Sequence, residues 1–247
     1  MSRVIAFWSP SGAGASTLLL NVAACMGARR ANLAAVDLNL VTPSLALAAD
    51  LLPHDRPRSA CLSRLLPALD GGWLTAEELN RHLLPGPGFA LLPGMLDVVA
   101  ASNLTDGQAR QIVQTLAGRF EYVLADLTPA IDSVACLPLL EQADQVVLVV
   151  GPEIASRFHT RRYLEAVKAM GLDGKCLAVL NRAGAIAVDQ VVQDLDMQIR
   201  ATVPDLKQMP GLVEAGQIAG LAQSVSPALA KFRTAVEGLV KLLGAGG

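Results

Sequence analysis

Seven short runs of apolar residues recur along the chain, and six of them contain at most one polar residue. A strand with one face in water alternates apolar and polar side chains, whereas a strand buried on both faces is apolar throughout. Segments with helical apolar spacing separate the runs. The pattern therefore predicts an α/β fold: a doubly wound, mostly parallel sheet with helices on both faces. The expected strands are 4–8, 33–38, 89–92, 122–127, 145–150, 176–180 and 199–203, and the main expected helices are 16–28, 105–118, 154–170, 188–195 and 227–243.

The segment 53–87 interrupts this alternation. It carries prolines at positions 53, 57, 67, 85 and 87, and short helices are expected at 59–66 and 75–83. A length of 247 residues fits one large domain. We therefore expect a single domain, 1–247, in which 53–87 is a proline-rich helical insertion suited to specific contacts.

Charge and composition exclude several classes of protein. The formal net charge is −2, which disfavours sequence-specific binding to nucleic acid. No apolar stretch reaches the roughly 18 residues that a membrane span needs, and residues 4–8 are too short for a signal peptide. The four cysteines form no CxxC pair, which is typical of reduced core thiols. We expect a cytoplasmic protein without an integral membrane segment. His54 and His82 lie among prolines and charges and have no evident partners for a metal site.

A glycine-containing segment directly follows the first expected strand and opens the first expected helix. It reads Ser-Pro-Ser-Gly-Ala-Gly-Ala-Ser-Thr over 9–17. Glycines let backbone N–H groups turn inward, and a helix N-terminus attracts an anion, so the segment resembles a phosphate-binding loop. Such loops usually end in Gly-Lys-Ser/Thr, but here Ala15 follows Gly14. The alternative is a tight turn that binds no ligand.

Two aspartates stand at the carboxyl ends of expected strands, Asp37 after 33–36 and Asp126 after 122–125. Ligands bind at these ends in open α/β sheets. We favour a role for both aspartates in a ligand site, the alternative being that they cap the strand ends.

These motifs, in this order, resemble the MinD/ParA group of ATPases with a deviant phosphate loop. In that group the loop reads Lys-Gly-Gly-x-Gly-Lys-Thr/Ser-Thr. Gly12, Gly14, Ser16 and Thr17 match it, whereas Pro10 and Ala15 replace its two lysines and Ser11 its first glycine. A small residue in place of the second lysine is a habit of the pilus-assembly branch, CpaE and TadZ, and that branch is our preferred family.

The resemblance extends along the chain and implies ATP or ADP with Mg²⁺ as ligands. It places the nucleotide on residues 12–17, which include Ala13 and Ala15. Asn181 and Arg182 match the strand end that meets adenine, and Pro204 with Asp205 begins the segment that closes the base pocket, followed by 213–216. Magnesium would be held by the residues at the matching positions, Ser16, Asp37 and Asp126. Asn39 occupies the position of the water-orienting aspartate.

Three departures from the family pattern bear on the chemistry. Pro10 and Ala15 remove two positive charges from the phosphates, and Asn39 removes a carboxylate. Residues 1–167 contain no lysine, so only an arginine near the loop is expected to compensate. Because phosphoryl transfer depends on positioning and charge neutralisation, we expect weak or no ATP hydrolysis. Nucleotide binding is expected to be weak, with no binding as the alternative.

The resemblance implies a localisation or scaffold factor for pilus or secretion machinery, with a degenerate nucleotide site. The protein is expected to form a homodimer, to bind proteins of that machinery, and to reach the inner membrane or a cell pole through them. A working ATPase switch for positioning a septum, flagellum or chromosome is the alternative, with an arginine from the 157–162 segment entering a partner's site. A third interpretation is a flagellar or chromosome-positioning regulator that uses the fold only for contacts with other proteins.

Two further segments have a functional and a structural interpretation. Arg157, Arg161 and Arg162 lie in one expected helix, with Arg157 and Arg161 on the same face. The functional interpretation is contact with a partner, lipid or DNA, but we favour a solvated face in which Arg161 pairs with Glu165. The apolar stripe of the last helix, 227–243, resembles a membrane anchor, but we favour a core-facing stripe.

Overall fold

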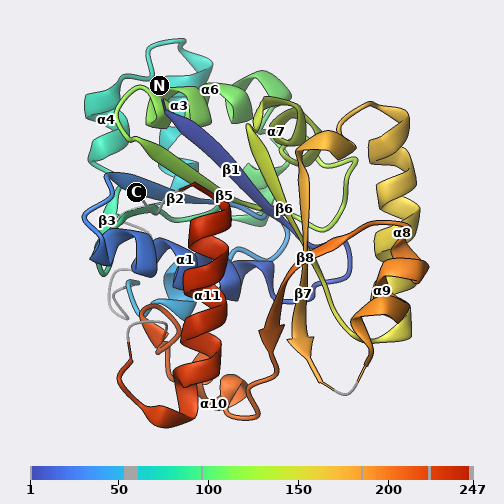
Figure 1. The fold of residues 1–247 in the computed structure, drawn as a ribbon. Coiled ribbons are helices and arrows are strands. Elements are labelled where there is room, and N and C mark those ends of the chain that lie inside the picture. Colours follow the sequence, from blue (N-terminus) through green and yellow to red (C-terminus); the bar gives the residue numbers. More distant parts are fainter. Residues whose placement is uncertain (1, 53–60, 96, 185, 222–223, 245–247) are drawn as a thin grey trace.

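The computed structural model describes residues 2–52, 61–95, 97–184, 186–221 and 224–244. Its centre is an eight-stranded sheet in the order β3-β4-β2-β5-β1-β6-β7-β8 (Figure 1). All pairs are parallel except β3–β4. The predicted α/β fold with a mostly parallel sheet is confirmed. The strands are β1 Arg3–Trp8, β2 Leu33–Leu38, β3 Leu84–Pro85, β4 Ala90–Leu92, β5 Tyr122–Leu127, β6 Gln145–Val150, β7 Cys176–Ala183 and β8 Ile199–Pro204.

Helices join the strands and cover both faces of the sheet. The long ones lie close to their predicted ranges, and several one-turn helices were not predicted. The helices are α1 Ala15–Ala28, α2 Leu45–Ala48, α3 Leu66–Asp70, α4 Ala76–Asn80, α5 Val98–Ala101, α6 Asp106–Ala117, α7 Cys136–Gln142, α8 Ile154–Ala169, α9 Val188–Leu195, α10 Met209–Glu214 and α11 Ala230–Leu242. Short 3-10 helices are η1 Leu62–Leu65, η2 Asp173–Lys175 and η4 Pro227–Leu229.

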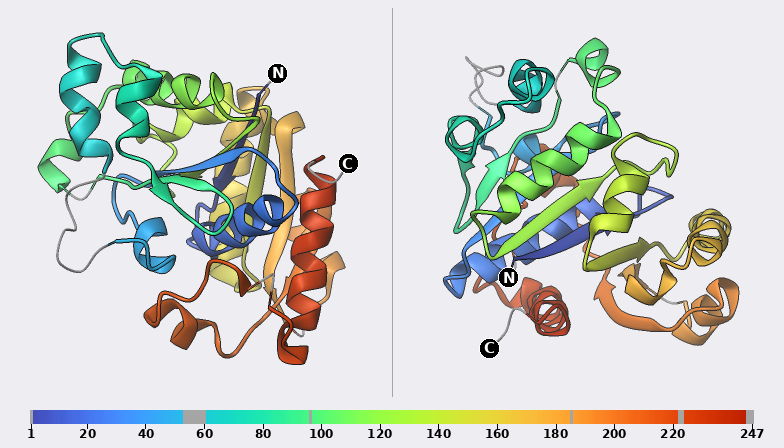
Figure 2. Two further views of the ribbon diagram at one scale, coloured as in Figure 1. Left: turned by 90° about the vertical axis from the view of Figure 1, so that its left-hand side faces the viewer. Right: turned by 90° about the horizontal axis from the view of Figure 1, so that it is seen from above.

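The sheet separates two large apolar clusters because successive side chains of a strand point to opposite faces. In β1, Ile5 and Phe7 join the cluster under α1 and α11, whereas Val4, Ala6 and Trp8 join the one under α6 and α7. Figure 2 shows α1 and α11 on one side of the sheet and α6 on the other. The uninterrupted apolar runs of the sequence thus reflect burial on both faces.

The helices of the 53–87 segment pack onto the α6 side of the sheet. Leu62, Leu65 and Leu79 are buried in the same apolar cluster as the strands. Residues 53–60, which include His54 and the start of one predicted helix, lie outside the described residues. Strand β3 was not predicted; it pairs antiparallel with β4 at the sheet edge, where Pro85 is tolerated.

The last helix is part of the core, as predicted. Phe232, Val236 and Leu239 are at most 2% exposed and lie in the cluster that contains α1. The helix packs along α1 and β8. Within the described residues, no helix combines the length and the apolar character needed to cross a bilayer.

Candidate functional site

Three neighbouring strands, β2, β5 and β1, bring the two predicted aspartates and the loop together at the carboxyl ends of the strands. Strand β1 pairs with β5, which also pairs with β2, and the glycine-containing loop follows β1 directly. Asp37 of β2 lies opposite Asp126 of β5 in the parallel register, and Phe7 of β1 lies opposite Asp126 as well. The order of connections reverses beside β1, which is where open α/β sheets bind their ligands. The two carboxylates and the loop therefore share one site.

The loop is held by its own hydrogen bonds. The backbone N–H of Ala13 donates to the Ser9 hydroxyl at 2.7 Å, and the N–H of Gly12 donates to the Ser9 carbonyl at 3.2 Å. Gly12 and Gly14 have φ angles of 68° and 91°, a region that side-chain-bearing residues rarely adopt. Helix α1 begins at Ala15, so the loop turns into a helix N-terminus, the geometry that suits an anion.

The side chain of Asn181 on β7 holds this loop through a hydrogen bond to its backbone. Its amide nitrogen donates to the carbonyl of Ala13 at 2.8 Å, and a Cβ atom on Gly14 would lie 2.7 Å from the same nitrogen. The asparagine was predicted to meet adenine. The structure shows that its amide group also fixes the loop, a role that no sequence signal indicated.

Ser16, Asp37 and Asp126 form the acidic part of the site. The Ser16 hydroxyl donates to Asp126 Oδ2 at 2.6 Å. Burial raises the pKa of Asp126 well above its usual range, the Asp37 carboxylate raises it further, and the Ser16 bond opposes the shift. Burial also raises the pKa of Asp37 to about 6, against the backbone N–H groups of Leu45, Asn39 and Ser44, which lower it. A cation would relieve the repulsion between the two carboxylates.

The residues present fit a magnesium ion. The second carboxylate oxygen of Asp126, Oδ1, is buried and has no hydrogen-bond partner among the described residues. Mg²⁺ is commonly held by one or two carboxylates together with substrate phosphates. No cluster of three or more His, Cys, Asp or Glu side chains suited to a metal occurs in the described part of the chain, so phosphate oxygens would have to complete the shell.

Asn39 is engaged within its own turn. Its side-chain oxygen accepts from the backbone N–H groups of Val41 and Thr42, and its amide nitrogen donates to the Thr42 hydroxyl at 3.1 Å. The side chain is 7% exposed. An amide held in this way cannot take a proton from water at the site as a carboxylate could.

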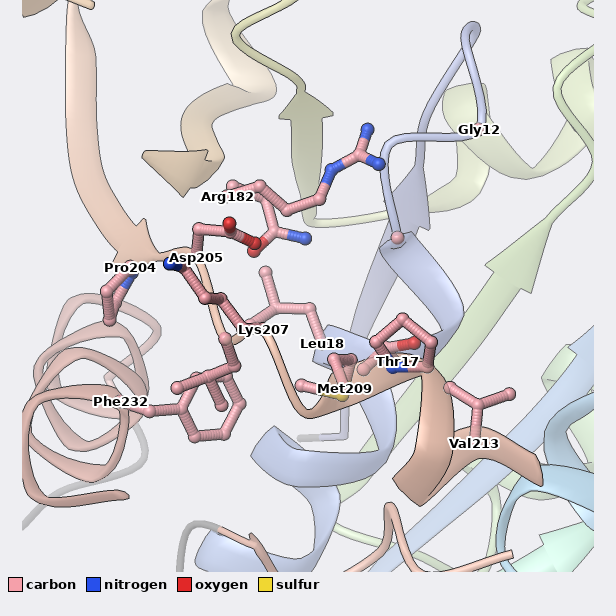
Figure 3. A pocket seen from close by; sticks show the side chains of 14 residues that line it. Gly12, Thr17, Leu18, Arg182, Pro204, Asp205, Lys207, Met209, Val213 and Phe232 are labelled. Carbon is pink, nitrogen blue, oxygen red and sulfur yellow. The ribbon is translucent and has the colours of Figure 1, made fainter. Parts of the chain in front are cut away.

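Two cavities meet at the loop. One of about 250 Å³ covers the metal side and includes Asn39, while the other, of about 500 Å³, extends from the loop to α10 and α11. Figure 3 shows the larger cavity between the loop at Gly12, Asp205 and Phe232. The smaller is lined by Ser9, Gly12, Gly14, Ala15, Ser16, Thr17, Asn39, Thr42, Ser44, Asp126, Leu127 and Pro129. The larger is lined by Gly12, Gly14, Thr17, Leu18, Asn181, Arg182, Pro204, Asp205, Leu206, Lys207, Met209, Pro210, Val213 and Phe232.

Most predicted site residues line these cavities. Ala13 and Asp37 do not line either cavity but are buried and bond to Asn181 and Ser44, which do. Lys207 also lines the larger cavity and was not predicted, although it lies only two residues after Asp205. The apolar wall of Met209, Val213 and Phe232 comes from α10 and α11, and only Val213 belongs to the segment that the resemblance had singled out.

The basic face of α8 is held by ion pairs. Arg161 pairs with Glu165 at 3.3 Å, as predicted, and its guanidinium also donates to the Asp194 carbonyl. Arg157 pairs with Asp194 of α9 at 2.5 Å and also bonds to the Pro152 carbonyl. Both arginines therefore stabilise the packing of α8 on α9.

Comparison with known proteins places the fold. No family model matches the chain, and no curated protein sequence matches it either. Among solved structures, a ParA family ATPase from Chlorobium tepidum TLS superposes with a TM-score of 0.83 over 97% of this chain and 99% of that one, at 21% identity. MinD from Pyrococcus horikoshii OT3, a septum site-determining protein complexed with Mg-ADP, matches with a TM-score of 0.79 at 21% identity, covering 100% and 99% of the two chains.

A putative plasmid partition protein from Borrelia burgdorferi B31, bound to AMPPNP, matches with a TM-score of 0.73 at 13% identity over 98% of this chain and 100% of that one. Identities this low establish the fold alone. The chain has the MinD/ParA-type ATPase fold.

Proposed function

We propose that this chain binds ATP or ADP together with Mg²⁺, hydrolyses ATP very slowly or not at all, and acts as a scaffold or localisation factor of the CpaE/TadZ kind. One observation carries the binding proposal. The loop, Ser16 and Asp126 line one formed cavity. The inference of slow or absent hydrolysis has a separate basis, which is the presence of Pro10 and Ala15 at the lysine positions of the loop.

Binding rests on groups that the chain retains. The N–H groups at the start of α1 suit phosphate oxygens, and Ser16 with Asp126 suits the cation. Bound Mg²⁺ would neutralise charge on the phosphates. The apolar wall of Met209, Val213 and Phe232 suits a flat purine ring. Fold relatives with Mg-ADP and AMPPNP in their structures support the ligand class.

Hydrolysis lacks the groups that would stabilise the transition state. Pro10 and Ala15 supply no charge to the transferring phosphoryl group, and the Asn39 amide is engaged by Val41 and Thr42. The alternative ATPase switch requires an arginine from α8 in a partner's site. Arg157 is only 11% exposed and pairs with Asp194 of α9, which disfavours Arg157 in that role, whereas the exposed Arg161–Glu165 pair is open to displacement. A bound nucleotide would then stabilise one conformation without driving a cycle.

The cellular role is inferred from the resemblance of the loop. A protein that binds nucleotide without turnover is suited to assembly, so we expect a homodimer that recruits pilus or secretion proteins and reaches the inner membrane or a pole through them. Affinity capture with the purified protein should recover a secretion ATPase or pilus subunits. Recovery of only flagellar or chromosome-partition proteins would replace this role with the positioning alternative.

Titration calorimetry with Mg-ATP tests the binding proposal. We expect saturable binding that Ser16→Ala weakens, with Ser102→Ala as a matched control because Ser102 directly follows α5 and its hydroxyl donates to the Val99 carbonyl. A phosphate-release assay on the same samples should show little or no turnover. Absence of binding at millimolar Mg-ATP would refute the proposal, and rapid phosphate release would favour the ATPase switch.

A further inference from the structure

Arg182 lies at an irregular point of β7. The register between β7 and β8 shifts between Leu180 and Ala183, so Asn181 and Arg182 fall on the irregular stretch. Arg182 has a φ of 55°, which is uncommon for a residue with a side chain. Bulges and such backbone angles often re-aim a side chain beside a functional site. Here they turn Asn181 under the loop and leave Arg182 on the rim of the larger cavity.

The guanidinium of Arg182 lies close to the loop. Figure 3 shows it extending toward the loop at Gly12. A Cβ atom on Gly151 would lie 3.0 Å from Arg182 Nη2 and 3.2 Å from the Ser156 hydroxyl, and Ser156 is 2.6 Å from the Ser11 hydroxyl of the loop. The guanidinium and Ser156 therefore both lie beside Gly151, and Ser156 in turn bonds to the loop.

Glu153, just before α8, holds this guanidinium. Its carboxylate lies 3.2 Å from Arg182 Nη2, and the two side chains are 52% and 45% exposed. An ion pair this exposed contributes little to stability, so an anion of higher charge can displace the carboxylate at low cost. Arg182 and Lys207 are the cationic side chains on the wall of the larger cavity.

We propose that Arg182 is the phosphate-binding cation of this chain, and that its pairing alternates between Glu153 and the phosphates of a bound nucleoside di- or triphosphate. The inference rests on the proposed nucleotide site. It identifies Arg182 as the residue that supplies the positive charge which the loop lacks. An arginine fork can bond two phosphate oxygens at once, so it replaces in function the lysines absent at Pro10 and Ala15. Glu153 lowers affinity by competing for the same guanidinium.

Mg-ADP and Mg-ATP titrations of Arg182→Ala test this assignment. Loss of a charge-assisted bond should weaken both ligands by about tenfold or more and leave adenosine binding unchanged. Glu153→Gln should tighten both by about twofold to fivefold, the range expected for an exposed ion pair. Arg200→Ala is the matched control, because Arg200 is exposed near the amino end of β8, whereas the proposed site lies at the carboxyl ends of the strands.

Arg182→Gly provides a second variant should the alanine protein fold poorly, since glycine adopts a φ of 55° without strain. Unchanged ADP and ATP affinity in the Arg182 variants would overturn the assignment, with the nucleotide site intact. An equal loss for adenosine would overturn it too, because Arg182 would then contact the base or ribose. Absence of nucleotide binding by the wild-type protein would refute both this assignment and the proposed function.

Discussion

Replacing Gly14 with alanine tests the geometry of the loop. The backbone φ of 91° would strain an alanine, at a cost of about 1–3 kcal/mol. The new methyl group would also lie 2.7 Å from the Asn181 amide nitrogen, which would have to leave the Ala13 carbonyl. A lost hydrogen bond that leaves a buried donor unpaired costs about a further 1 kcal/mol or more. We therefore expect Gly14→Ala to lower the free energy of unfolding by about 2–4 kcal/mol and to abolish nucleotide binding.

Urea unfolding followed by circular dichroism measures this loss, with Gly12→Ala as the matched control. Gly12 has a φ of 68°, but a Cβ atom there meets nothing within 4 Å, so only backbone strain of about 1–2 kcal/mol applies. In an Asn181→Ala background the cost of Gly14→Ala should fall by about 1 kcal/mol. Equal losses for the two glycines, together with no coupling to Asn181, would refute the argument that Asn181 supports the loop.

Further predictions concern charge and the core. The raised pKa of Asp37, about 6 in the folded protein, adds stability that is fully present below about pH 4 and lost as the pH rises through 6. Without Mg²⁺, wild-type unfolding free energy should therefore fall more steeply over this window than that of Asp37→Asn; parallel profiles would contradict the raised pKa. Ala15→Lys should tighten Mg-ATP binding about tenfold or more, measured by calorimetry, because position 15 lines the smaller cavity, where we propose that the phosphates bind. Phosphate release should stay slow in this variant unless Asn39→Asp is added. Leu239→Ala should cost about 2–5 kcal/mol in urea unfolding without changing sedimentation with lipid vesicles, since Leu239 is fully buried; a change in vesicle binding would revive the membrane interpretation of α11.

Much of the fold follows from sequence because the central strands are buried on both faces. Their apolar runs mark β2, β5 and β6 at their observed bounds. The edge strand β3 has two residues, one of them Pro85, and carries no such pattern. The one-turn helices α2 and α5 are also too short to show a helical period. Such short elements depend on tertiary contacts, which leave no pattern in a short stretch of sequence.

The site residues that belong to a sequence motif could be predicted. Roles that depend on contacts between distant parts of the chain could not. Strand ends and loop glycines identify Asp126, Ser16 and the loop. The support of the loop by Asn181 depends on the irregular register of β7, and the access of Lys207 to the cavity depends on the path between β8 and α10. Likewise, only the structure shows that the Asn39 amide is engaged by its own turn.

The central claim is that this chain binds ATP without hydrolysing it. The most direct test is whether the nucleotide bound to the protein remains ATP. The protein would be incubated with Mg-ATP, separated rapidly from free ligand, denatured, and its nucleotide identified by chromatography. We predict that ATP is recovered in saturable amounts, that it remains ATP after long incubation, and that Ser16→Ala reduces the recovery. Recovery of ADP would show that the site hydrolyses ATP despite Pro10, Ala15 and Asn39, and recovery of no nucleotide, together with no saturable binding in calorimetry, would show that the cavity is not a nucleotide site.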